Sequence, residues 1–447
     1  MVSRSVRRMN VARTKNQQPI TNNLANNASL PNSQNIAQFQ LSNGIRVLAY
    51  ENFASPAVII NGYLMAGALD ESDPTKRGLA GFVSDCLTRG TQRFSYEQIF
   101  EQTETIGANL SVSSGMFTTG FFTKSLAEDM PLLLDLLSDV IRHPTFPEAE
   151  LEKERAEWLT GLQERTNSTQ SMCSLAFHEL CYPEHHPFHW SGDGYPQTAQ
   201  AITRDDVKQF HKNFFAPQDM VVVVTGAVKA SHARDAVAAA FGDWSATRSG
   251  DRNTMPGATA IKKKLRRHVK MPGKSQSNLM LGFPALPTSH PDWLTAAMMN
   301  SILGQFGMYG RLGESVRKEE GLVYYIGSRF DGGMAQGPWY LYAGTNPKTV
   351  NRVIDIAMQE VARIQNKKVT PRELDDNKHY FTGSTPLQME TNEGIAGQII
   401  NMVRYERDLD YLLTFNDRVN AITQADVLRV AQTWLSADNY VLATAGA

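Results

Sequence analysis

The sequence has few cysteines, no excess of positive charge and no long apolar run, and each shortage argues against a class of protein. Only three cysteines occur in 447 residues. Cys86, Cys173 and Cys181 show no CxxC spacing and leave an odd thiol, which argues against a disulfide framework or a thiolate zinc cluster. Lys and Arg number 44 against 45 acids, so the positive field of a nucleic-acid binder is missing. No run of about 18 apolar residues could span a bilayer.

The segment 1–34 contains no acid, and none precedes Glu51. It is basic and rich in Asn and Gln, a composition typical of a disordered tail. It also lacks the apolar run of a secretory signal. We therefore expect a cytoplasmic protein with a dispensable tail, in keeping with the unpaired cysteines. Transit peptides also contain Arg and Ser and few acids, so location in an organelle matrix remains the alternative.

The sequence contains an internal repeat. AITRDDVKQFHKNFFAPQDMVVVVTGA, from Ala201, aligns without a gap with AITQADVLRVAQTWLSADNYVLATAGA, from Ala421, 220 residues later. In both copies a threonine, Thr203 or Thr423, is placed to cap a helix, and a β-branched run predicts the following strand. The repeat predicts two homologous lobes.

The predicted fold is α+β, with two lobes that each contain a mixed or antiparallel sheet with helices packed on one face. We expect a tail over 1–34, lobes over 35–244 and 263–447, and a linker over 245–262, which is rich in turn formers. Strand character is found at 44–50, 58–66, 277–285, 322–330 and 338–344. Apolar residues at helical spacing predict helices at 77–88, 128–142, 291–303 and 349–364.

Several of these segments resemble the pitrilysin/insulinase metallopeptidases. GALDESDPTKRGLAGFVSDCLTRGT is similar to the family segment that carries the inverted zinc motif HxxEH. The similarity continues through IGANLSVSSGMFTTGFFTKSL and, in the second lobe, through RLGESVRKEEGLVYYIGS. It covers essentially residues 37–447 and implies a processing-peptidase-like fold.

The resemblance places the zinc ligands of the family on residues that cannot hold zinc. The first His of HxxEH falls on Gly81, the Glu on Ser84 and the second His on Asp85, while the distal Glu ligand falls on Gly161. Ser84 is too weakly basic to take a proton from metal-bound water. Asp85 alone falls short of the three protein ligands that a catalytic zinc needs. We expect neither metal nor cofactor in this chain, and no activity of the chain alone.

A cluster of His and Cys within twelve residues is a candidate replacement metal site; it contains His178, Cys181, His185, His186 and His189. HELCY is not HExxH, and the adjacent His185 and His186 cannot both project from one helical face. The density of such residues without ligand spacing is weak evidence. A structural role is expected, and metal binding by these histidines stays open.

The second lobe retains two residues of the family pattern, whereas the first lobe has lost the zinc ligands. Family members carry an Arg and a Tyr seven residues apart, and these fall on Arg317 and Tyr324. The resemblance implies that both reach a zinc site across a chamber and bind the peptide backbone and the oxyanion of the tetrahedral intermediate. The residues alone allow another reading, in which Arg317 pairs with Glu314 or Glu320 and Tyr324 is an ordinary strand aromatic.

The run ILGQFGMYGRLG lacks the spacing of a dinucleotide or Walker loop. It could correspond to a shortened form of the substrate-handling loop in the non-catalytic subunit of mitochondrial processing peptidase. Alternatively, its glycines only allow a tight approach of strand and helix. These glycines are Gly304, Gly307, Gly310 and Gly313.

Three functions are compatible with these observations. The leading hypothesis is a non-catalytic subunit of a heterodimeric zinc peptidase, similar to the Arg/Tyr-bearing chain of bacterial two-chain members. Its HxxEH-bearing partner would hold the zinc, and its substrates would be peptides or unfolded polypeptides. The second is a structural or assembly subunit, as the core proteins of the respiratory cytochrome complex are within this fold. The third is a chain that hydrolyses peptides alone with an unrecognised metal site.

Overall fold

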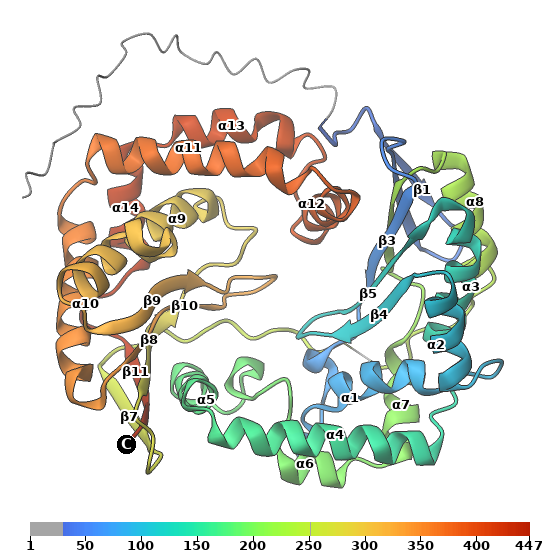
Figure 1. Ribbon diagram of the computed structural model, residues 1–447, viewed down its shortest axis with the longest axis horizontal. Coiled ribbons are helices and arrows are strands. Elements are labelled where there is room, and N and C mark those ends of the chain that lie inside the picture. The colour runs from blue at the N-terminus through green and yellow to red at the C-terminus, as the bar shows by residue number, and fades with distance from the viewer. Residues whose placement is uncertain (1–29, 251) are drawn as a thin grey trace, which may run out of the picture. The chain divides into compact units, whose positions relative to one another are not determined.

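Two β-sheets organise the fold, one in each half of the chain (Figure 1). The computed structural model describes residues 30–250 and 252–447. The first sheet has the strand order β1-β2-β6-β3-β5-β4, and only its β2–β6 pair is parallel. Its strands are β1 Ile36–Gln40, β2 Arg46–Glu51, β3 Ala57–Leu64, β4 Asn109–Ser114, β5 Thr119–Leu126 and β6 Val221–Gly226.

The second sheet repeats this plan without a counterpart of β1. Its order is β7-β11-β8-β10-β9, and its β7–β11 pair is again the parallel one. The edge strand β9 therefore corresponds to the edge strand β4 of the first sheet. The strands are β7 Leu265–Lys270, β8 Ser277–Pro284, β9 Val323–Phe330, β10 Pro338–Thr345 and β11 Val441–Gly446.

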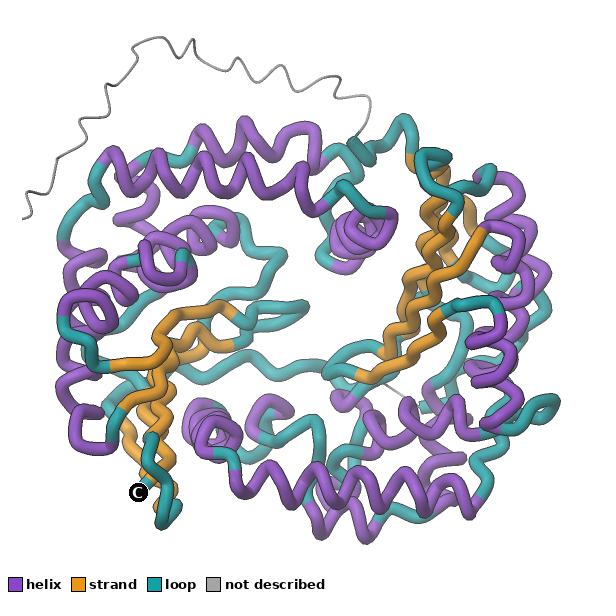
Figure 2. The backbone as a smooth tube through the Cα atoms, viewed as in Figure 1, coloured by secondary structure: helices purple, strands orange, loops and turns teal. Residues whose placement is uncertain are grey.

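Helices surround both sheets (Figure 2). In the first half they are α1 Leu79–Cys86, α2 Tyr96–Thr105, α3 Met130–Arg142, α4 Glu148–Asn167, α5 Thr169–Cys181, α6 Pro196–Ala201, α7 Arg204–Phe214 and α8 Ala230–Phe241. In the second half they are α9 Trp293–Asn300, α10 Val350–Asn366, α11 Pro371–Gln388, α12 Asn392–Arg404, α13 Tyr411–Ala421 and α14 Gln424–Trp434. Two π-helical segments, Ser301–Gln305 and Gly313–Glu319, follow α9.

The repeated sequence forms the same helix and strand twice. Each bound of α14 and β11 lies 220 residues beyond its counterpart in α7 and β6. The Thr203 hydroxyl accepts the N–H of Asp206 at 3.2 Å, and Thr423 does the same for Asp426 at 3.2 Å. The α+β fold of two homologous lobes is therefore confirmed, and with it the two threonine caps.

The sheets are covered on both faces, which the sequence did not predict. Helices of the same half bury one face of each sheet in a large apolar core. The other face is covered by a helix from the opposite half. Ile395, Ile399 and Ile400 of α12 pack against Ile59 and Val223 of the first sheet. Correspondingly, α5 packs against β7, β8 and β11 through Cys173, Ala176 and Phe177 (Figure 1).

The connecting segment lies against the first lobe. Apart from residue 251, which is outside the described part, residues 245–262 form neither helix nor strand. The guanidinium of Arg252 pairs with the Asp70 carboxylate at 3.3 Å, and the Asn253 amide donates to the Leu69 carbonyl at 2.8 Å. A linker predicted from turn formers is thus held in place by polar contacts.

Of the predicted tail over 1–34, residues 1–29 lie outside the described part. Within residues 30–34, the Ser33 N–H donates to the Asp410 carboxylate at 2.8 Å. The end of that range therefore belongs to the folded unit that begins at Pro31. In the part of the chain that the structure describes, no helix has the length and apolar character needed to cross a membrane.

Candidate functional site

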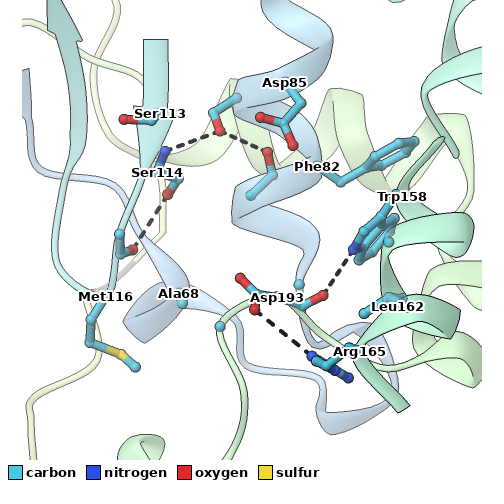
Figure 3. A pocket seen from close by; sticks show the side chains of 16 residues that line it. Ala68, Phe82, Asp85, Ser113, Ser114, Met116, Trp158, Leu162, Arg165 and Asp193 are labelled. Carbon is cyan, nitrogen blue, oxygen red and sulfur yellow. Dashed lines mark hydrogen bonds and ion pairs between the residues drawn. The ribbon is translucent and has the colours of Figure 1, made fainter. Parts of the chain in front are cut away.

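The four positions that correspond to the family's zinc motif line one cavity of about 560 Å³ (Figure 3). Gly81, Ser84 and Asp85 lie on α1, where spacings of three and four residues place them on one helical face. Gly161 comes from α4. The structure thus brings together residues that are 80 positions apart in the chain, as the resemblance implies.

A buried carboxylate fixes the start of α1. Glu71 is 5% exposed and accepts the N–H groups of Ala80 at 2.9 Å and Gly78 at 3.2 Å. Burial raises its pKa to about 7, although these two donors and Arg77 act in the opposite direction. Gly78 has φ +93°, and a Cβ there would lie 2.7 Å from the Trp158 ring. The helix that carries the altered motif therefore begins at a tightly packed, polar anchor.

The residues at this place do not fit a catalytic zinc. The Ser84 hydroxyl is engaged, because it donates to the Gly81 carbonyl at 2.7 Å and accepts the Ser114 N–H at 3.1 Å. A Cβ at Gly161 would meet nothing within 4 Å, so the place of the distal ligand is open space. Within residues 30–250 and 252–447, no group of three His, Cys, Asp or Glu could hold a metal ion. Of the four positions that correspond to the motif, only Asp85 carries a side chain that could ligate a metal.

The cavity wall contains residues that sequence reasoning did not single out. Trp158 on α4 stacks on Phe82 with ring centroids 5.0 Å apart, and its Nε1 donates to the Asp193 carbonyl at 2.9 Å. Arg165 donates to the Gly194 carbonyl at 2.8 Å. Trp158 and Arg165 lie three residues before and four after Gly161, so the helical face of α4 was a signal that could have found them.

The histidines of this cluster make hydrogen bonds that stabilise the local structure. Its ring nitrogens bond to backbone carbonyls: His178 to Phe188 at 3.1 Å, His186 to Pro256 at 3.2 Å and His189 to Tyr182 at 2.8 Å. Burial lowers the pKa of His178 and His186, which favours their neutral forms. These imidazoles tie the turn after α5 together, and their ring nitrogens do not converge on a common point.

Arg317 and Tyr324 lie at the edge of the second sheet, and both side chains are exposed. Arg317 is exposed on the π-helical segment Gly313–Glu319, and Tyr324, near the start of β9, is 72% exposed. The two acids considered as partners are taken: Glu314 pairs with Lys318 at 2.8 Å and Glu320 with Arg352 at 2.7 Å. Within the described residues Arg317 forms no ion pair with either acid.

A buried ion pair holds the segment that carries Arg317. Arg311 is 8% exposed and donates to both carboxylate oxygens of Glu373, at 2.7 and 3.1 Å. Burial opposes ionisation of Glu373, but the bonds from Arg311 and the Thr370 N–H outweigh it and lower its pKa to about 2. Because Glu373 also caps α11, the pair fixes the π-helical segment to a rigid helix.

The glycine run allows close packing. A Cβ at Gly313 would lie 2.2 Å from the Gly307 carbonyl oxygen, and one at Gly304 would lie 2.5 Å from the Ser328 hydroxyl. Both approaches require glycine. Met308 and Tyr309, within the same run, are 46% and 82% exposed. The packing explanation therefore accounts for Gly304 and Gly313.

Comparison with known proteins gives two matching family models and several relatives. Residues 46–186 match "Insulinase (Peptidase family M16)", and residues 201–381 match "Peptidase M16 inactive domain". An "uncharacterized zinc protease" of Bacillus subtilis is 25% identical over 419 residues, which cover 91% of this chain and 97% of the relative. "Mitochondrial-processing peptidase subunit beta" of Homo sapiens is 22% identical, over 91% of this chain and 83% of the relative.

Solved structures show the same fold. A crystal structure described as a peptidase M16 inactive domain from Pseudomonas fluorescens superposes with a TM-score of 0.86 at 24% identity, over 92% of this chain and 98% of that one. A protease from Helicobacter pylori also gives 0.86, at 18% identity, over 93% and 100%. Since two models of one family account for residues 46–186 and 201–381, this chain belongs to the insulinase family, peptidase family M16.

Proposed function

We propose that this chain is the non-catalytic subunit of a heterodimeric zinc peptidase, whose HxxEH-bearing partner chain holds the zinc. Arg317 and Tyr324 would complete the partner's active site. One contrast within the chain carries the proposal. Among residues 30–250 and 252–447, no ligand set for a metal lies at the cavity of α1, whereas Arg317 and Tyr324 have exposed side chains and Arg317 forms no ion pair. The substrates would be peptides or unfolded polypeptides.

The two side chains have suitable chemistry for that role. A guanidinium and a phenol are strong hydrogen-bond donors, and a donor held ready for developing negative charge typically contributes about 2.7 to 4 kcal/mol to transition-state binding. The backbone just before the π-helical segment is anchored by the Arg311–Glu373 pair. π-Helical segments are rare in proteins overall, and those that occur are often found at functional sites. Arg317 therefore sits on an unusual but firmly anchored element.

The test is activity of the complex. The chain is co-purified with an HxxEH-bearing partner, and peptide hydrolysis is measured for each chain alone and for both mixed. We expect turnover only from the mixture. Arg317→Gln and Tyr324→Phe should each lower kcat/KM by about 100-fold or more without weakening assembly. Matched controls are Arg372→Gln and Tyr380→Phe, which alter exposed residues on α11.

Two results would each support one of the other two functions. Unchanged activity in Arg317→Gln and Tyr324→Phe complexes would favour a structural or assembly subunit. Turnover by the solitary chain at the rate of the complex would show an unrecognised active site. The proposal also includes a cytoplasmic location, in keeping with three cysteines that are free and buried.

A further inference from the structure

The second lobe has a counterpart of α1, and its first turn has backbone donors without partners. α9 is the first α-helix after β8, as α1 is after β3, and each has 8 residues. In the first lobe the Glu71 carboxylate accepts the N–H of Ala80, the second residue of α1, at 2.9 Å. The second and third residues of α9 are Leu294 and Thr295, and within the described residues their N–H groups make no hydrogen bond. A donor that a carboxylate satisfies in one lobe is therefore unsatisfied in the other.

The residue that precedes α9 does not supply the missing acceptor. The Asp292 side chain makes no bond to the start of the helix. Its carboxylate instead accepts Arg429 at 2.7 and 3.2 Å and the Trp434 Nε1 at 2.9 Å. Aligned peptide dipoles leave partial positive charge at a helix start, so free N–H groups there attract an anion.

A cavity of about 540 Å³ lies at this helix start. Leu294 and Thr295 line it, and so does Thr288, which precedes the helix. Thr288 is only 7% exposed, and its hydroxyl makes no hydrogen bond within residues 30–250 and 252–447. Buried polar groups in proteins are generally hydrogen-bonded, because an unsatisfied one is costly. A polar ligand in the cavity would give this hydroxyl a partner.

Two guanidiniums line the same cavity, that of Arg407 from the segment after α12 and that of Arg418 from α13. They lie 4.5 Å and 5.2 Å from the centroid of the Tyr411 ring. Stacking uses the face of a guanidinium and leaves the N–H donors at its edge available. In the described part of the chain neither arginine forms an ion pair, although Glu406 and Asp408 also line the cavity. Both acids are exposed, so water and salt screen their charge.

We propose that this cavity binds a small organic anion, with its carboxylate or phosphate group at the start of α9. The two guanidiniums would supply charge-assisted hydrogen bonds, and the two free N–H groups would complete the shell of donors. The body of the ligand would pack on aromatic side chains, which a bare inorganic ion would leave uncovered. These aromatic residues are Trp293, Tyr405 and Tyr411. The inference is independent of the proposed peptidase role.

The test uses the full chain without a partner and measures binding by isothermal titration calorimetry. The probes are hydrocinnamate and phenyl phosphate, which distinguish a carboxylate from a phosphate ligand, and the neutral hydrocinnamamide. We expect at least one anion to bind about tenfold tighter than the amide or more, which is about 1.4 kcal/mol. Arg407→Gln should weaken binding of that anion about tenfold and leave the amide unchanged. The matched control Arg372→Gln, at an exposed arginine on α11 outside the cavity, should preserve the preference.

A pair of substitutions at Thr295 guards against loss of folding. Thr295→Glu places a carboxylate in the first turn of α9, where negative charge stabilises a helix. The variant should keep or raise the melting temperature and abolish anion binding, because the chain then supplies the anion itself. Thr295→Gln, which adds a side chain of the same size without charge, should retain binding. The inference would be overturned by equal affinity for anion and amide, by no detectable binding of either anion, or by a preference that survives both Arg407→Gln and Thr295→Glu.

Discussion

The buried carboxylate of Glu71 shows how one residue makes stability depend on pH. Its pKa in the folded chain is about 7, above the ordinary value of 4.5. Between these two values the folded state binds more protons than the unfolded state, so the free energy of unfolding falls as pH rises. Above about pH 7 the carboxylate is charged and buried, although two N–H groups still bond to it.

Glu71→Gln tests this assignment, because the amide keeps an acceptor for one N–H and cannot ionise. Relative to wild type, we expect the variant to gain stability progressively between about pH 5 and about pH 8. Urea unfolding at several pH values measures the difference. A difference that is constant over this range would show that Glu71 titrates at an ordinary value.

Asp85 and Gly161 show how much of the cavity could be predicted from the sequence. Gly81, Ser84, Asp85 and Gly161 were identified by their positions in a known motif, and the fold places all four at one cavity. Trp158 was not identified, although it lies three residues before Gly161 and so on the same face of α4. Among the described residues, Arg89 pairs with Glu154 on α4 and not with the nearer-in-sequence Asp85, which spacing does not indicate.

At the scale of elements, α1 and α4 bring the four positions that correspond to the family's zinc motif to one cavity. Gly81 and Gly161 offer open space, since a Cβ at Gly81 would meet only the Gly192 carbonyl, at 3.9 Å. The triple variant Gly81→His, Asp85→His and Gly161→Glu should therefore bind one equivalent of zinc. With Ser84 left in place, the variant should bind metal without gaining hydrolysis.

Metal analysis after dialysis measures the outcome, and the double variant without Gly161→Glu is the control that should retain less zinc. A folded triple variant that binds no zinc would contradict the assignment of these positions. The design leaves the hydrogen bonds between Ser84, Gly81 and Ser114 intact. Their retention keeps α1 attached to β4.

The internal repeat made the elements predictable to an unusual degree. Helices and strands that carry apolar periodicity or a threonine cap appear where they were expected, as α7 and α14 show. The helix expected over 291–303 instead ends at Asn300 and continues as a π-helical segment. A period of 3.6 residues cannot distinguish the two, because they differ in hydrogen bonding and hardly in which side chains are buried.

At the scale of the whole described unit, each half covers the other's sheet. The apolar face of α12 could be seen in the spacing of Ile395, Ile399 and Ile400. Periodicity indicates that a face is buried, yet it does not name the surface that buries it. Only the fold shows that this surface belongs to β3 and β6 of the other half.

Ile399→Ala tests whether the packing of α12 against the first sheet couples the two halves. Ile399 is fully buried, so its truncation should lower the free energy of unfolding by about 2 to 5 kcal/mol. Hydrogen exchange should then accelerate in β3 as well as in α12. The neighbouring Gln398→Ala should change stability by about 0.5 kcal/mol or less. Faster exchange confined to the second half would show that the halves unfold independently.

The reciprocal placement of α5 and α12 limits how the two halves of this chain can move. A hinge that swung the halves apart would expose two apolar clusters to water at once, one on each sheet. Bending of this chain is therefore an expensive way to admit a polypeptide. If the proposed two-chain peptidase exists, admission of a polypeptide would then require this chain to move as one body relative to its partner.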